Sequence, residues 1–72
     1  MTGPALRGAV VVASNRAAAG VYEDTTGPLI VDFLAELGFA VDAPVVVPDG
    51  EPVGRAIAAA VAGGARVVLT TG

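Results

Sequence analysis

An uninterrupted apolar run, GAVVVA, occupies residues 8–13 and decides the fold class. A strand with one wetted face alternates apolar and polar residues, and this run shows no alternation. Both faces of the strand should therefore be buried. That arrangement is typical of a parallel sheet with helices packed on its two sides.

Helical and strand-like patterns alternate along the rest of the chain. A helix is predicted to begin near Pro28, with Gly27 or Thr26 as its cap, and to stop at Gly38. A strand follows over residues 39–47, then a helix opening at Pro52, then a strand over residues 66–69. The order β-α-β-α-β predicts an α/β fold, a three-layer α/β/α domain with a mainly parallel sheet.

Within these elements the apolar spacing predicts which residues face the sheet. The first helix should bury one face, formed by Leu29, Ile30, Phe33, Leu34 and Leu37. The second helix should bury the stripe Val53, Ala56, Ile57, Ala60 and Val61. Pro44 is awkward in a central strand, because proline cannot donate a ladder hydrogen bond, and it predicts a sheet edge or a bulge.

Composition narrows the class of protein. The chain is 54% hydrophobic and 15% charged with a net charge of −3, and it contains no Cys and no His. The chain therefore has no disulfides and lacks the commonest metal ligands. Its negative net charge also does not provide the basic surface that binding of nucleic acid requires. No apolar run is long enough to span a bilayer, so we expect a cytoplasmic protein without membrane association.

Three strands and two helices amount to about half of a doubly wound domain, which typically has ~100–150 residues. We therefore expect residues 1–72 to be the N-terminal part of a single domain in a longer, truncated chain, and to be inactive alone.

Ligands of open parallel sheets bind beyond the carboxyl ends of the strands. That rule selects three segments, residues 14–27, 48–52 and 70–72. Each allows two interpretations. Ser14 and its neighbours could hold an anion or cap the backbone, and the segment before Pro28 could bind phosphate or be an ordinary helix cap. Asp49 could bind Mg²⁺ or orient a reacting group, or be a turn residue.

Two motifs resemble the opening of a known family. They are VVASNR at residues 11–16 and GVYEDTTGP at residues 20–28. Proteins of the Mog/MoaB family have there a strand, S-D-R, G-x-Y-x-D and S/T-G-P. Val47-Pro48-Asp49 and VVLTTG at residues 67–72 also match, so the resemblance covers nearly the whole chain.

The resemblance implies a molybdopterin-binding domain of molybdenum cofactor biosynthesis. Enzymes of this family use Mg²⁺ and ATP to adenylylate molybdopterin and commonly assemble as homotrimers, with small molecules as their other partners. Asp49 matches the catalytic aspartate, and the resemblance implies that it holds Mg²⁺. The positions that match the substrate pocket are Ser14, Asp24, Thr26, Gly27, Thr70, Thr71 and Gly72.

One departure is Asn15, where the family commonly has Asp, and this puts a metal-binding or orienting role there in doubt. Two further interpretations stay open. The protein could bind molybdopterin as a scaffold without transferring a group, or its rim residues could serve only as caps and turns.

Overall fold

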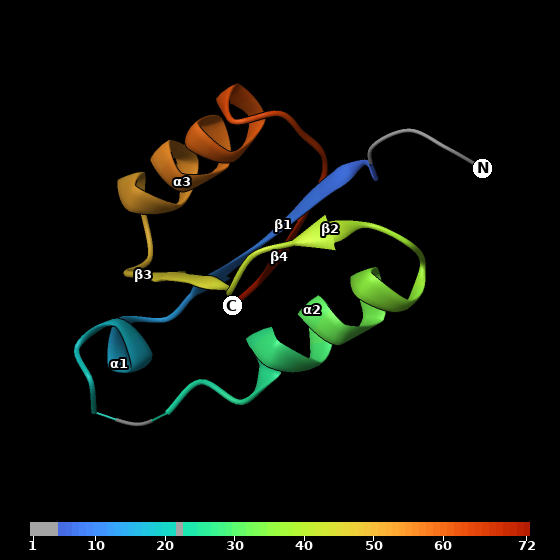
Figure 1. Ribbon diagram of the computed structural model, residues 1–72. Helices are drawn as coiled ribbons and strands as arrows, with labels where there is room; N and C mark the ends of the chain where they lie inside the picture. The colour runs from blue at the N-terminus through green and yellow to red at the C-terminus, as the bar shows by residue number, and fades with distance from the viewer. Residues whose placement is uncertain (1–4, 22) are drawn as a thin grey trace.

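The computed structural model describes residues 5–21 and 23–72 and shows three layers (Figure 1). A sheet forms the middle layer, with one long helix on each of its faces (Figure 1). The elements in chain order are β1 (Arg7–Ala13), α1 (Asn15–Ala18), α2 (Thr26–Glu36), β2 (Ala40–Val41), β3 (Val45–Val47), α3 (Glu51–Ala62) and β4 (Ala65–Thr71). The predicted α/β fold is confirmed.

Strand β1 lies in the middle of the sheet and pairs in parallel with all three other described strands. Strand β4 runs along one side of it, with Val10 opposite Leu69. Strands β2 and β3 follow one another along the other side. The parallel pairing expected from the unbroken apolar run is therefore confirmed.

The strand predicted over residues 39–47 is divided into β2 and β3. Gly8 pairs with Val41 and Val11 pairs with Val45. Between these two pairs β1 advances by three residues, while the segment that runs from β2 to β3 advances by four. The extra residue falls in the segment that contains Pro44. This bulge lies at an edge of the described sheet, as the proline predicts. At such a position the missing N–H of proline does not remove a hydrogen bond between strands.

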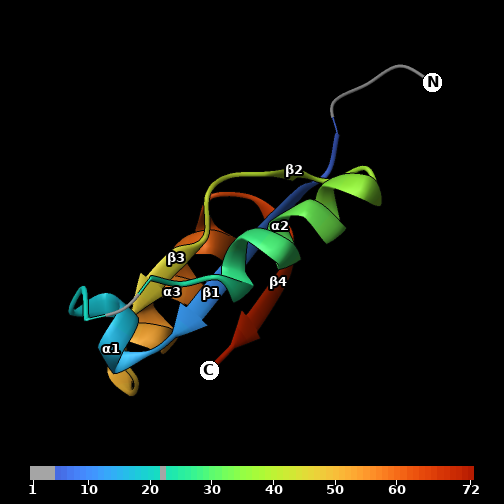
Figure 2. The same cartoon turned by 90° about the horizontal axis from the view of Figure 1, so that it is seen from below.

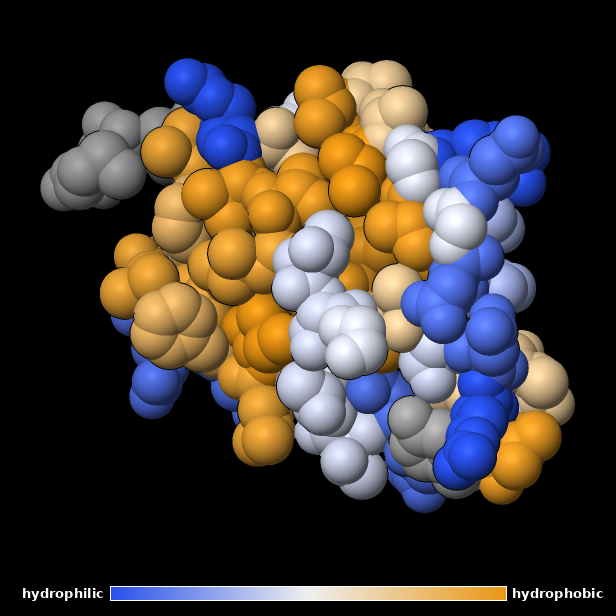
Figure 3. Space-filling model, turned by 180° about the vertical axis from the view of Figure 1, so that it is seen from behind, coloured by the Kyte–Doolittle hydropathy of each residue, from blue (hydrophilic) through white to orange (hydrophobic). Residues whose placement is uncertain are grey.

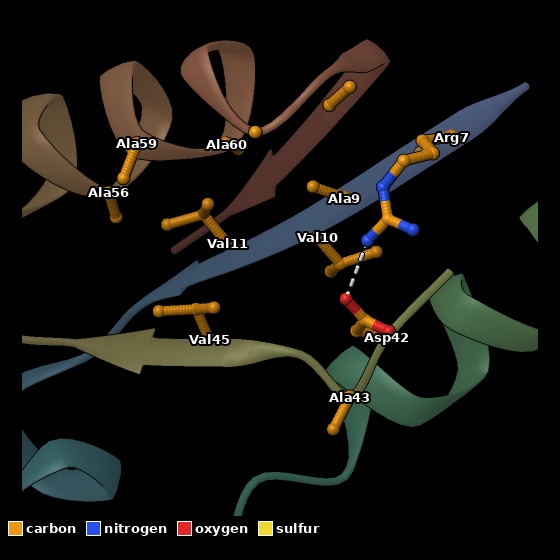
Figure 4. Close-up of a pocket in the computed structure, with 13 residues that line it drawn as sticks. Arg7, Ala9, Val10, Val11, Asp42, Ala43, Val45, Ala56, Ala59 and Ala60 are labelled. Carbon is orange, nitrogen blue, oxygen red and sulfur yellow. Dashed lines mark hydrogen bonds and ion pairs between the residues drawn. The ribbon is translucent and has the colours of Figure 1, made fainter. Parts of the chain in front are cut away.

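The core lies around β1. Val10, Val11 and Val12 are 1%, 1% and 5% exposed, and Leu34 of α2 is 2% exposed. Val10 and Val12 pack with Leu34, whereas Val11 lies on the opposite face, toward α3 (Figure 4). Successive side chains of a strand point to opposite faces, so this strand is buried from both sides as predicted.

The predicted buried face of α2 is partly wrong. Leu34 is buried and Ile30 half-buried, but the side chains of Leu29, Phe33 and Leu37 are 68%, 55% and 61% exposed. The helix rests on the sheet through the side that carries Gly27, and residues three, four and seven positions further on share that side. The three exposed residues follow a neighbouring row, i, i+4 and i+8.

Helix α3 begins at Glu51, one residue before the predicted start, and packs less deeply. Val53, Ala56, Ile57 and Ala60 are half-buried, but Val61 is 58% exposed, so its assignment to the buried stripe is wrong. Apolar surface is also extensive on the side of β4 (Figure 3). None of the helices in residues 5–21 and 23–72 is long and apolar enough to cross a membrane.

Candidate functional site

The carboxyl ends of β1, β3 and β4 point to one end of the molecule. There the chain leaves β1 into α1, leaves β3 into α3, and enters α2 from the long connection. In Figure 2, α1, the start of α2 and the far end of β4 lie toward this same end. The sheet therefore gathers the three segments that sequence analysis selected. Tyr22, within the motif at residues 20–28, lies outside the described residues.

A small cleft of about 110 Å³ opens between the end of β4 and the start of α2. Its lining residues are Val12, Ser14, Asp24, Thr25, Thr26, Thr71 and Gly72. Five of these are pocket positions that the resemblance implied; Val12 and Thr25 were not among them. Ligand sites usually measure about 300–1,000 Å³, so this cleft can hold one group of a ligand rather than a whole nucleotide.

Asp24 caps helix α2. One carboxylate oxygen accepts hydrogen bonds from the backbone N–H groups of Thr26 and Gly27, both at 3.2 Å, and the other accepts from Gly27 at 3.2 Å. The helix begins at Thr26 after Thr25, so the expected cap at Thr26 or Gly27 is wrong. The carboxylate takes the place that a phosphate would occupy at this helix end.

Gly27 is buried where the capping loop meets the bulged edge of the sheet. A Cβ atom here would collide with the Asp24 carboxylate and would lie 2.8 Å from Cβ of Pro44. No other residue type fits without moving one of these groups. Gly27 thus allows the capping loop to approach Pro44 closely, although it does not line the cleft.

Ser14 links the end of β1 to its surroundings. Its Oγ accepts a hydrogen bond from the N–H of Ala17 at 3.2 Å, which caps the short helix α1. Its own N–H donates to the carbonyl oxygen of Val47 at 2.9 Å. The capping interpretation is realised, and the residue also lines the cleft.

The three residues at the end of β4 differ in their surroundings. Thr71 is half-buried and faces the cleft, whereas Thr70 is exposed and does not line it. Neighbouring strand residues point to opposite faces, which explains the difference. Gly72 lies close to β1, since a Cβ atom there would be 3.3 Å from the carbonyl oxygen of Ala13.

Asp49 lies outside the cleft, in the exposed turn between β3 and α3. Its carboxylate makes no hydrogen bond or ion pair within residues 5–21 and 23–72. Its backbone N–H donates to Oδ1 of Asn15 at 2.9 Å. This bond could not be predicted from the sequence, because it joins residues 34 positions apart. The only available signal was that parallel strands bring the residues after β1 and β3 together.

The side chains present limit the kind of metal site that the protein can form. In the described part of the chain, no three His, Cys, Asp or Glu side chains gather closely enough to hold an ion. Mg²⁺, however, is commonly held by one or two carboxylates together with substrate phosphates and water. The exposed Asp49 carboxylate fits that limited role.

A larger cavity, about 290 Å³, lies at the other end of the sheet beneath α3. Its walls are mostly Ala and Val side chains, such as Val11, Val45 and Ala56 (Figure 4). At its mouth Arg7 and Asp42 form an ion pair at 2.8 Å (Figure 4). The two charges pair with one another, and the rest of the lining is mainly apolar.

Comparison with known proteins agrees with this geometry. Residues 9–72 match the family described as "Probable molybdopterin binding domain". A curated relative from Pyrococcus furiosus, named molybdopterin adenylyltransferase, is 41% identical over 63 residues, which are 88% of this chain and 37% of the relative.

A solved structure titled "anomalous substructure of MogA" superposes with a TM-score of 0.87 at 48% identity. The match covers 92% of this chain and 44% of that one. The chain thus spans less than half the length of both relatives.

Proposed function

Because this chain belongs to the Mog/MoaB family of molybdopterin-binding domains, we propose that the protein is a molybdopterin adenylyltransferase of molybdenum cofactor biosynthesis. In this reaction an oxygen of the terminal phosphate of molybdopterin attacks the α-phosphorus of ATP. A new phosphorus–oxygen bond forms, the bond between the α- and β-phosphates breaks, and pyrophosphate leaves.

One observation supports the proposal most directly. The cleft at the strand ends is built from Ser14 at the end of β1, Asp24 and Thr26 at the start of α2, and Thr71 and Gly72 at the end of β4. All five are positions that match the family's substrate pocket. The cleft suits one part of molybdopterin, and threonine hydroxyls beside exposed backbone provide neutral hydrogen-bond partners for it.

Asp49 is the proposed catalytic residue. Phosphoryl-group transfer depends mainly on positioning and on neutralising charge, so a site needs few reactive side chains. The Asp49 carboxylate would hold the Mg²⁺ that accompanies ATP. That ion supplies charge neutralisation for the phosphate oxygens when it is bound. The anchored backbone of Asp49 holds the carboxylate at the rim, beside the end of β1.

A second function has its own support. Asp49 does not line the cleft, and the Asp24 carboxylate is engaged in capping α2. A pterin could therefore occupy the cleft without touching an acid that takes part in transfer. The alternative is a molybdopterin-binding scaffold that transfers no group.

Pyrophosphate release separates the two functions. The complete gene product is mixed with ATP, Mg²⁺ and molybdopterin, and pyrophosphate is measured with and without the pterin. The enzyme should release pyrophosphate only when molybdopterin is present. Tight binding of molybdopterin without release would establish the scaffold instead, and absence of pterin binding would reject both.

We also propose that the protein forms a homotrimer. The large exposed side chains of Leu29, Phe33, Leu37 and Val61 are of the kind that subunit contacts bury. Sedimentation of the complete gene product should give a mass of three subunits. A monomer at micromolar concentration would contradict the proposal.

A further inference from the structure

The turn that carries Asp49 is held from outside by two successive residues of another segment. The N–H of Ser14 donates to the carbonyl oxygen of Val47 at 2.9 Å. Oδ1 of Asn15 accepts the N–H of Asp49, also at 2.9 Å. The start and the middle of the turn are therefore both fixed to the chain where it leaves β1.

Where the turn enters α3, the carbonyl oxygen of Gly50 accepts the N–H of Val53 at 3.0 Å, but the residues before it contribute little to fixing the shape of the turn. Pro48 has no N–H to donate, and Gly50 has a φ of 96°, in a region that glycine enters freely. The N-cap position of α3 provides no side-chain capping bond either. The Asn15 amide is thus the one side chain that holds the Asp49 backbone within the described residues.

We propose that Asn15 is a positioning residue, whose amide oxygen sets the direction in which the Asp49 carboxylate projects. This inference rests on the proposed catalytic role of Asp49. The bond engages the backbone of Asp49 and leaves its carboxylate available for a magnesium–nucleotide. What the site requires at position 15 is a hydrogen-bond acceptor, because the partner is an N–H group.

A neutral acceptor has a further advantage at this rim. Substrates of adenylyl transfer carry several negative charges, and a second carboxylate beside Asp49 would repel them. An aspartate at position 15 could accept the same bond, but it would add that charge. Asn15 meets the geometric requirement with no extra charge, so the departure from the family's common Asp preserves an orienting role.

The test compares Asn15→Leu, which has a similar shape and no acceptor, with Asn15→Asp, which keeps an acceptor. Both are made in the complete gene product, and kcat and KM are measured by pyrophosphate release. Asn15→Leu should lower kcat by about ten- to a hundredfold, since a misplaced catalytic group costs up to ~10²-fold, with KM values little changed. Asn15→Asp should restore most of kcat and raise KM for ATP.

A matched control separates positioning from general loosening of α1. Ala18→Gly weakens this short helix without touching the bond to Asp49, so its kcat should stay near that of the wild type. Hydrogen exchange supplies a readout that does not depend on activity: the Asp49 amide should exchange faster in Asn15→Leu and keep its protection in Asn15→Asp.

The outcomes are distinguishable. An active wild type with an equally active Asn15→Leu variant would overturn the inference and leave the proposed function intact. Equal loss of kcat in Asn15→Leu and Asn15→Asp would overturn it too, because the acceptor would then be irrelevant. A wild type that releases no pyrophosphate would instead overturn the proposed function, and with it the positioning role of Asn15 in that reaction.

Discussion

The starts of α2 and α3 lie at the same rim, and an aspartate precedes each, yet the two acids are used in opposite ways. The carboxylate of Asp24 is turned back onto the backbone N–H groups of its own helix. At Asp49 it is the backbone N–H that is held, by Asn15, and the residue is exposed. The same residue type serves the fold in one place and is available for chemistry in the other.

The difference between the two aspartates is tested most directly by removing the charge at each position and measuring turnover. Asp49→Asn in the complete gene product should lower kcat by about a hundredfold or more, as is usual when a preorganised electrostatic contact is lost. Molybdopterin affinity should change little, because Asp49 lies outside the cleft.

Asp24→Asn is the matched control for that charge removal, since an asparagine oxygen can still cap α2. It should keep most of the wild-type kcat, and any change should appear in the KM for molybdopterin, because Asp24 lines the cleft. An unchanged rate in Asp49→Asn would remove Asp49 from the mechanism, and a collapse of turnover in Asp24→Asn would show that both acids take part.

The second prediction concerns Gly27, which lies against the carboxylate of Asp24. Gly27→Ala should lower the free energy of unfolding by about 1–3 kcal/mol, because the added methyl group overlaps the Asp24 carboxylate and Pro44. Urea denaturation followed by circular dichroism measures the change.

Gly54→Ala serves as the control for that glycine. Nothing lies within 4 Å of a Cβ atom at position 54, which is inside α3. Alanine there should stabilise the protein by about 0.5–1 kcal/mol, since glycine is unfavourable in a helix interior. If both variants were stabilised, the close contacts around Gly27 would be of no consequence.

The third prediction separates capping from chemistry on a smaller scale. Asp24→Ala should cost about 1 kcal/mol of stability, within the range for loss of an N-cap side chain. Asp49→Ala should change stability by no more than about 0.5 kcal/mol, because its carboxylate has no partner among the described residues. Thermal unfolding of the two variants in parallel measures this difference, and equal losses would contradict the distinction.

Sequence and structure agree where local chemistry decides the outcome. The run at residues 8–13 is sufficient to predict a buried parallel strand, and Pro44 is sufficient to predict a sheet edge or a bulge. The packed face of α2 could not be predicted, because Leu29, Phe33 and Leu37 follow helical spacing as well as the residues that do pack. Periodicity shows that an apolar row exists, whereas docking geometry decides which of two adjacent rows meets the sheet.

The candidate site shows the same division. Parallel topology alone predicts that Ser14, Asp24 and Thr71 come to one rim. It does not predict that the Asp24 carboxylate caps α2 or that Thr70 lies outside the cleft. Nor does it predict the hydrogen bond between Asn15 and the backbone of Asp49. Each of these features depends on the direction of a side chain or on a bond between distant segments. Local sequence patterns predict neither of the two.

The smallest expected effect concerns Asp42, an aspartate at the opposite end of the sheet, whose carboxylate is paired with Arg7 at 2.8 Å. The two side chains are 84% and 49% exposed, so water competes for both charges. A double-mutant cycle with Arg7→Ala and Asp42→Ala should give a coupling of no more than about 1 kcal/mol, and salt should reduce it. Turnover should be unaffected, because the pair lies far along the sheet from the rim; a loss of turnover would mean that the amino end of the sheet also contributes to the site.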